Sequence, residues 1–97
     1  MTHDDLPLVP IADADDRQIV HVQGRVVSIT VEPRDATAEL VAVVNDGSDS
    51  LAAVFMGRRD IVGVDAGADI SLEGRVIVED ERKMMYNPRY DLHRTVL

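Results

Sequence analysis

Ile19–Val31 (IVHVQGRVVSITV) is the most informative segment for the fold, because it is long, rich in β-branched residues and alternates apolar with polar side chains. Such a pattern predicts a β-strand with one buried face. The apolar residues change phase near Val26–Ser28, which predicts a β-bulge that bends one long strand so that it serves two sheet faces. Glu32-Pro33 is expected to end this strand, because proline cannot donate to a central ladder.

Further strands follow at short intervals along the chain. Glu39–Val44 and Ser50–Met56 flank the turn sequence Asn45-Asp-Gly-Ser, so we expect them to form a hairpin. Asp69–Val78 is the clearest alternating strand of the sequence. A polar loop separates it from a short fifth strand at Met84–Tyr86, which Asn87-Pro88 ends.

One connector interrupts the succession of strands. Residues 57–67 hold too many glycines for a long helix, so they predict a connector with at most one or two helical turns. Its apolar residues Ile61, Val62 and Val64 are expected to form a hydrophobic plug. Together these features predict an all-β fold, a five-stranded Greek-key barrel of the oligonucleotide/oligosaccharide-binding (OB) type, with the connector between strands three and four. An SH3-like barrel is the alternative, although it usually lacks an insertion of this length before its fourth strand.

Charge is distributed unevenly along the chain. The 97 residues carry a formal net charge of −8, and five acids with one base lie in residues 1–17. That segment also contains two prolines and no sustained periodicity. We therefore predict a loosely ordered acidic arm over residues 1–17, an OB-fold domain over 18–92 and a short C-terminal tail over 93–97.

Several short motifs occur in a fixed order along the predicted barrel. They are Val22-Gln-Gly-Arg-Val-Val-Ser-Ile, Asn45-Asp-Gly-Ser-Asp-Ser-Leu, Gly74-Arg-Val and Asn87-Pro-Arg-Tyr. With this order and spacing the chain resembles the tRNA_anti-like OB domains, and within them the wedge domain of RecG-type branched-DNA helicases. Phe55-Met-Gly-Arg-Arg-Asp-Ile-Val-Gly, together with Tyr86-Asn-Pro-Arg-Tyr, is similar to small stand-alone OB proteins of actinobacteria. The resemblance covers about residues 18–92 and implies an OB fold and, by association, nucleic-acid binding.

Catalytic and metal-binding signatures are absent from the sequence. Without cysteine the chain can form neither a thiolate zinc site nor a thiol nucleophile. The three histidines have no metal-ligand spacing, the acids of residues 13–16 lack the glycine turn and closing glutamate of a calcium loop, and no serine carries a nucleophile signature. We therefore expect no enzymatic activity, cofactor or metal. An acidic start and the lack of a long apolar run predict a cytoplasmic protein without membrane contact.

The remaining candidates are residues suited to hold a nucleic-acid strand. OB barrels stack bases on aromatic side chains and run basic loops along the backbone. Tyr86 is the stacking candidate, whereas Phe55 is expected in the core and Tyr90 as a latch over the barrel end. The basic candidates form a track over the first, fourth and fifth strands and a pair that opens the connector. They are Arg25, Arg75, Arg82, Lys83 and Arg89 for the track, and Arg58 and Arg59 for the pair.

Two of these assignments have alternatives that the sequence leaves open. Arg75 is equally suited to pair across strands with Glu73 or Glu79, and Arg58-Arg59 to pair with nearby acids of the connector. The sequence therefore predicts a non-enzymatic OB module that binds single-stranded or branched DNA, or RNA, weakly and without strong sequence preference. The alternative function is a protein-interaction or oligomerisation module, which docks a protein partner or a second copy through a strand edge and binds no nucleic acid.

Overall fold

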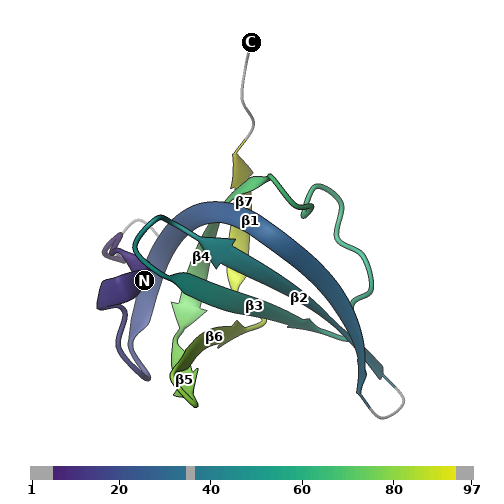
Figure 1. Cartoon of the computed structure of the whole chain (residues 1–97), viewed down its shortest axis with the longest axis horizontal. Helices are drawn as coiled ribbons and strands as arrows, with labels where there is room; N and C mark the ends of the chain where they lie inside the picture. The colour runs from purple at the N-terminus through teal and green to yellow at the C-terminus, as the bar shows by residue number, and fades with distance from the viewer. Residues whose placement is uncertain (1–5, 35–36, 94–97) are drawn as a thin grey trace.

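The computed structural model describes residues 6–34 and 37–93, which form an all-β structure, as predicted (Figure 1). Within these ranges a short 3-10 turn, η2 (Ile11–Asp13), precedes seven strands instead of the five expected. No helix in the described part of the chain has the length and apolar character needed to span a membrane. The strands are β1 (Ile19–Arg34), β2 (Thr37–Asn45), β3 (Ser50–Met56), β4 (Asp69–Arg75), β5 (Ile77–Glu79), β6 (Arg82–Tyr86) and β7 (Arg89–His93).

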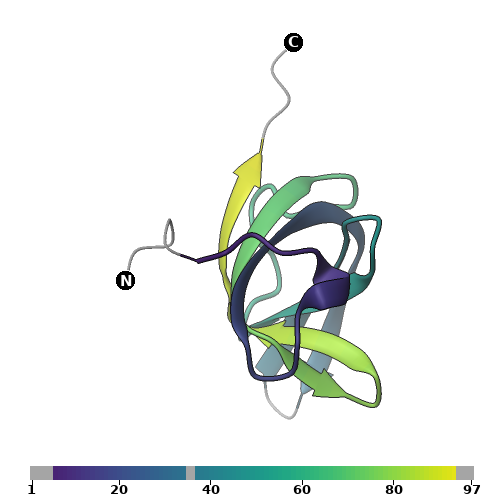
Figure 2. The same cartoon turned by 90° about the vertical axis from the view of Figure 1, so that its left-hand side faces the viewer.

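The strands form one sheet in the order β5-β6-β3-β2-β1-β4-β7. β4 and β5 are the two halves of the predicted fourth strand, interrupted at Val76. β4 pairs with β1, whereas β5 pairs with β6, which runs parallel to β3. Because one interrupted strand thus joins both sides of the sheet, the sheet curls into a barrel (Figure 2). The prediction of an OB-type barrel is confirmed, and the interruption accounts for one of the two extra strands.

β1 bends where its sequence pattern changes phase. The pairing register shifts between Val26 and Ser28, so the predicted bulge is confirmed. Residues 19–25 of β1 pair with β4 and residues 25–34 pair with β2, so the change of partner lies next to the bulge and Arg25 is paired on both sides. The expectation that Glu32-Pro33 ends the strand is wrong, because β1 continues to Arg34 with Pro33 opposite Ala38. Proline is tolerated there because this half of β1 pairs with β2 alone among the described residues.

The core fills the barrel with inward side chains from both halves of the sheet, among them Val22, Leu40 and Met85. Phe55 is also buried, as the sequence predicts. Its ring meets that of Tyr90 edge to face, with 5.6 Å between the ring centroids. Tyr90 therefore acts as the expected latch over this end of the core.

The C-terminal region adds the second extra strand. Residues expected to form a tail beyond the fifth strand instead form β7, which pairs antiparallel with β4 from Arg89 to His93. Tyr90 lies opposite Leu72 and Leu92 lies opposite Ile70, so both side chains share the inner face of β4. His93 consequently belongs to the barrel rather than to a tail, and residues 94–97 lie outside the described residues.

The N-terminal segment differs from the expectation of a loosely ordered arm over residues 1–17. Residues 7–9 lie along the start of β1, where the N–H of Val9 donates to the C=O of His21 at 3.0 Å. Ile11 and Ala14 are buried in the core. The segment is held in place by isolated contacts and not by a regular strand or helix, which explains why its sequence shows no periodicity. Residues 1–5 of the predicted arm lie outside the described residues.

The connector forms turns without a helix between β3 and β4. Ile61 and Val64 are each 2% exposed and plug the barrel, as expected. Val62 is 88% exposed, so its predicted place in the plug is wrong. The backbone reverses at Gly63, whose φ is +86°, and this reversal leaves Val62 outside. A Cβ at Gly63 would lie 2.5 Å from Cδ1 of Leu92, so the glycine also permits the connector to approach β7.

Candidate nucleic-acid interface

An apolar surface covers the outer face of β2, β3 and β6. Strand register places Val54 opposite both Tyr86 of β6 and Val41 of β2. Their neighbours Ala53 and Met85 are fully buried inside the barrel, so alternation along the strands turns this row to the outer side. Val54, in the middle of the row, is only 5% exposed, because the side chains around it cover it. A second outward row lies beside it. We call the two rows the platform, and its residues are Val41, Val43, Ala52, Val54, Met84 and Tyr86.

Tyr86 is the one aromatic residue of the platform, and it is 40% exposed. Its hydroxyl lies 3.8 Å from Sδ of Met84 on the same strand. The following residue, Asn87, adopts a positive φ of 50° and fixes the end of β6 against β3. Its backbone N–H donates to the C=O of Val54 at 2.7 Å, and its Oδ1 accepts from the N–H of Met56 at 2.9 Å. The Asn-Pro motif therefore sets the position of the tyrosine as well as ending its strand.

Three predicted basic residues lie close to the platform. Arg82 shares the outward side of β6 with Met84 and Tyr86, about 13 Å along the strand from the tyrosine. Arg58 and Arg59 are exposed and follow the end of β3, which Asn87 joins to the Tyr86 end of β6. None of these arginines forms an ion pair with another described residue. The structure thus brings together basic side chains at both ends of the platform.

The other predicted basic residues lie elsewhere and have partners of their own. Nε of Arg25 lies 3.1 Å from Oδ1 of Asp69, and Nη1 of Arg75 donates to the C=O of Arg17 at 2.7 Å rather than to Glu73 or Glu79. Arg89 lies on β7, opposite Glu73. Because Arg75 pairs opposite Ile19, it lies roughly 20 Å along the sheet from Arg25. These residues therefore do not form one continuous track with Arg82.

Lys83 holds the N-terminal segment. Its side chain is 15% exposed and points to the inner side of β6. Nζ donates to the C=O of Ile11 at 2.6 Å and of Ala12 at 3.0 Å, and it lies 3.5 Å from Oδ2 of Asp49. The ammonium group is therefore already surrounded by oxygen partners from the chain itself.

The outer face of β1, β4 and β7 is polar. Its central row places His21, Glu73 and Arg89 side by side. The neighbouring rows add Gln23, Ser71, Asp91, Arg25, Asp69 and His93, and Oγ of Ser71 contacts Nε2 of His93. This face holds acids and bases in alternation and carries no exposed aromatic residue in its rows.

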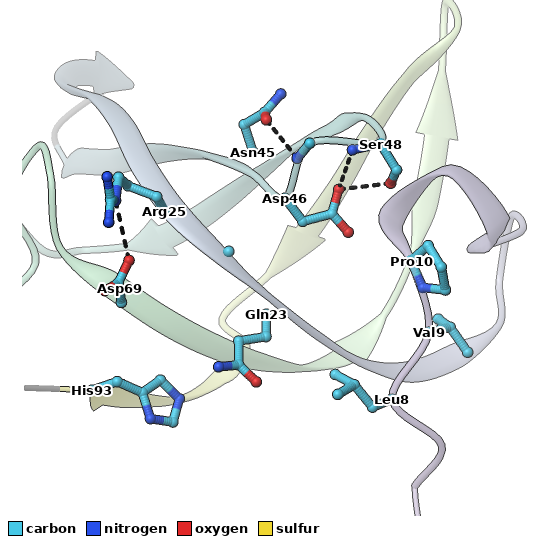
Figure 3. Close-up of a pocket in the computed structure, with 12 residues that line it drawn as sticks. Leu8, Val9, Pro10, Gln23, Arg25, Asn45, Asp46, Ser48, Asp69 and His93 are labelled. Atoms are coloured by element: carbon cyan, nitrogen blue, oxygen red, sulfur yellow. Dashed lines mark hydrogen bonds and ion pairs between the residues drawn. The ribbon is translucent and has the colours of Figure 1, made fainter.

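A groove of about 1080 Å³ opens between the N-terminal segment, β1 and the β2–β3 turn (Figure 3). Of the predicted site residues only Arg25 lines it. Asp46, on its rim, is already used in the fold. Burial opposes ionisation of this carboxyl, but hydrogen bonds from the Ser48 hydroxyl and from the backbone N–H groups of Ile11, Ser48 and Asp49 outweigh it. They lower the pKa of Asp46 to about 2.

The sequence predicts Tyr86 and Arg82 as candidate site residues but does not point to the apolar residues of β2, β3 and β6 that lie beside them. The signal was present in the alternation of Arg82, Met84 and Tyr86 along one strand. Its meaning depended on β3 lying beside β6, which the sequence does not show. Within the described residues no group of three or more His, Asp or Glu side chains is arranged to hold a metal ion.

Comparison with known proteins supports the fold. No family model matches the sequence, and no curated protein matches it significantly. Among solved structures, the chain is similar to part of RecG bound to a three-way DNA junction, with a TM-score of 0.70 and 16% identity. The match covers 88% of this chain and 12% of the RecG chain, so the chain spans only a small part of RecG. It is also similar to the OB domain of Ta0387 from Thermoplasma acidophilum, with a TM-score of 0.67, 16% identity and coverage of 93% and 90%.

Proposed function

We propose that the barrel is a non-catalytic module that binds single-stranded or branched nucleic acid on the platform, weakly and without strong sequence preference. The observation that carries this proposal is the exposed ring of Tyr86, which lies on an apolar surface between Arg82 and the Arg58-Arg59 pair. Bases unpaired in a single strand or at a branch offer both the aromatic face and the phosphates that such a surface fits. The three-way DNA junction in the similar RecG structure supports the same ligand class.

The composition of the platform accounts for weak binding. One aromatic residue supplies one base stack, worth about 1–3 kcal/mol. If three arginines contact a single strand, the logarithm of the binding constant falls with the logarithm of the salt concentration with a slope of about −2. Glu32 lies opposite Glu39, which in turn lies opposite Met56 at the same end as Arg58 and Arg59. Glu39 is only 5% exposed, so the exposed Glu32 is the acid that opposes phosphate there. No side chain of the platform carries the donor and acceptor pair that reads a base edge, which supports tolerance of sequence.

Fluorescence anisotropy with labelled single-stranded DNA, single-stranded RNA and a three-way DNA junction tests the proposal. We expect saturable binding at low salt, which weakens about tenfold or more in Tyr86→Ala and less in Arg82→Gln. Arg25→Gln is the matched control, because it removes an exposed arginine from the opposite face. Absence of binding near 100 μM protein would refute the function. An equal loss in Arg25→Gln and Arg82→Gln would refute the platform as the site.

A further inference from the structure

Most strand edges of the barrel are protected against pairing with another chain. Residues 7–9 cover the start of β1, and Asp16 Oδ1 accepts from the N–H of Val78 at 2.9 Å on β5. The second half of β1 carries the bulge at Val26–Ser28 and then Pro33, two features that prevent edge pairing. In the described part of the chain, β7 has no such cover, proline or bulge. It also contains no lysine, and no described residue pairs with its outer edge.

The backbone hydrogen bonds at the start of β1 show which groups β7 presents on that edge. His21 uses its N–H and C=O to bond residues 7–9, so these groups point away from β4. Because backbone groups alternate between edges along a strand, Val22 then bonds Leu72, and the groups of Leu72 point toward β1. Tyr90 lies opposite Leu72, so its N–H and C=O point away from β4. On its outer edge β7 thus offers a donor and an acceptor at Tyr90, and by the same alternation at Leu92, that no residue of 6–34 or 37–93 pairs in the sheet.

The charges of β7 are complementary to a second copy of the same strand. If two antiparallel copies meet with Tyr90 opposite Tyr90, each Arg89 faces Asp91 of the other copy, which gives two opposite-charge pairs. A shift that places Asp91 opposite Asp91 instead creates like-charge contacts. Arg89 and Asp91 are both exposed and available for such contacts. A second copy of this chain is therefore the occupant that the edge fits in both backbone and charge.

We propose that the chain forms a two-fold homodimer in which β7 pairs antiparallel with β7 of a second copy, centred on Tyr90. The joined strands extend each barrel sheet into its partner. The platform lies on β2, β3 and β6, on the other side of the sheet order, and stays open in the dimer. Because the paired strands are short, the dimer dissociates on dilution. The proposal is independent of nucleic-acid binding.

Sedimentation velocity over a concentration series tests the dimer with two charge-reversal variants, Arg89→Asp and Asp91→Arg. Each variant alone brings like charges together and is expected to remain monomeric at concentrations where the unmodified chain is dimeric. Mixed in equal amounts, the two variants face each other with opposite charges and regain the dimer mass. Arg58→Asp makes the same charge change away from β7 and is expected to leave dimerisation unchanged.

Each result of the sedimentation experiment either supports or overturns the proposed dimer. A monomeric unmodified chain at all concentrations overturns the dimer, and a mixture that stays monomeric overturns the register centred on Tyr90. Circular dichroism checks folding, because Arg89→Asp places a new acid opposite Glu73. If Arg89→Asp does not fold, Asp91→Asn and Asp91→Arg test the dimer instead. We expect Asp91→Asn, which removes the charge, to weaken association, and Asp91→Arg, which reverses it, to abolish association. Equal association of both with the unmodified chain overturns the proposal.

Discussion

The two ends of the barrel are closed by segments outside the strands, but in different ways. At one end Ile11 enters the core, and the backbone around it is held by polar side chains. Its N–H donates to Oδ2 of Asp46 at 2.9 Å, and its C=O accepts from Nζ of Lys83 at 2.6 Å. At the other end Ile61 and Val64 enter the core from one tight turn, closed by a backbone bond of 3.0 Å between them.

Charged residues of this chain therefore stabilise the fold in some places and remain exposed for a ligand in others. Lys83 follows Arg82 in a polar hairpin, a pattern that predicts a phosphate contact. The structure instead directs these neighbours to opposite sides of β6, so Lys83 anchors the N-terminal plug and Arg82 stays exposed. Strand alternation therefore separates a structural base from a candidate ligand base one residue away.

Removal of the plug side chains gives the largest expected effect. Ile11→Ala and Ile61→Ala each delete a nearly fully buried side chain and are expected to lower the free energy of unfolding by about 2–4 kcal/mol. Urea unfolding followed by circular dichroism measures both. Similar costs would show that residues 6–17 belong to the cooperative fold as fully as the connector does. A cost below about 1 kcal/mol for Ile11→Ala would contradict this view and support the prediction of a loosely ordered arm.

The hydrogen bond from Ile11 to Asp46 predicts that the contribution of this end of the barrel to the free energy of unfolding depends on pH. The pKa of Asp46 falls from 3.8 to about 2 in the folded chain. Because the folded pKa lies below the unfolded value, the charged carboxylate stabilises the fold above about pH 4, and this contribution is lost as the pH falls through about 2. Asp46→Asn is expected to cost about 1 kcal/mol at neutral pH, since the exposed surroundings screen the charge.

Unfolding of the chain and of Asp46→Asn at pH 7 and near pH 2 checks this prediction. The difference in stability between the two proteins should shrink at the lower pH. Ile61→Ala serves as the control, because no titratable group is bound to its side chain and its cost should change less. A constant difference for Asp46→Asn across this range would show that the charge of Asp46 contributes nothing.

The smallest effect is expected at Val62, between the two buried residues of the connector. Val62→Ser removes an apolar side chain that is 88% exposed, so the free energy of unfolding should change by no more than about 0.5 kcal/mol. The same urea unfolding measurement decides it. A loss comparable to that of Ile61→Ala would mean that Val62 is buried and that the connector plug holds three residues, as its sequence suggests.

Local pattern was sufficient for much of the fold. The phase change in Ile19–Val31 predicted the bulge, and the alternation of Ser50–Met56 predicted β3 with its exact bounds. The interruption at Val76 was not predictable, because the residues on both sides continue the same alternation. The same limit applied to the candidate site. Tyr86 and Arg82 could be named, but the apolar residues of β2 and β3 gain their role only from the pairing of β3 with β6.

Side-chain periodicity within a few residues was enough to predict most of the strand-forming segments, the bent first strand and the burial of Phe55, but not β7 or the interruption at Val76. Tertiary structure decided what depends on pairs distant in the chain: the anchoring of Ile11 by Asp46 and Lys83, and the separation of Arg25 and Arg75 from the platform. The physical reason is that a strand pattern specifies which side of a strand is buried. It does not specify which strand lies beside it, and neighbouring strands are what turn single side chains into a surface.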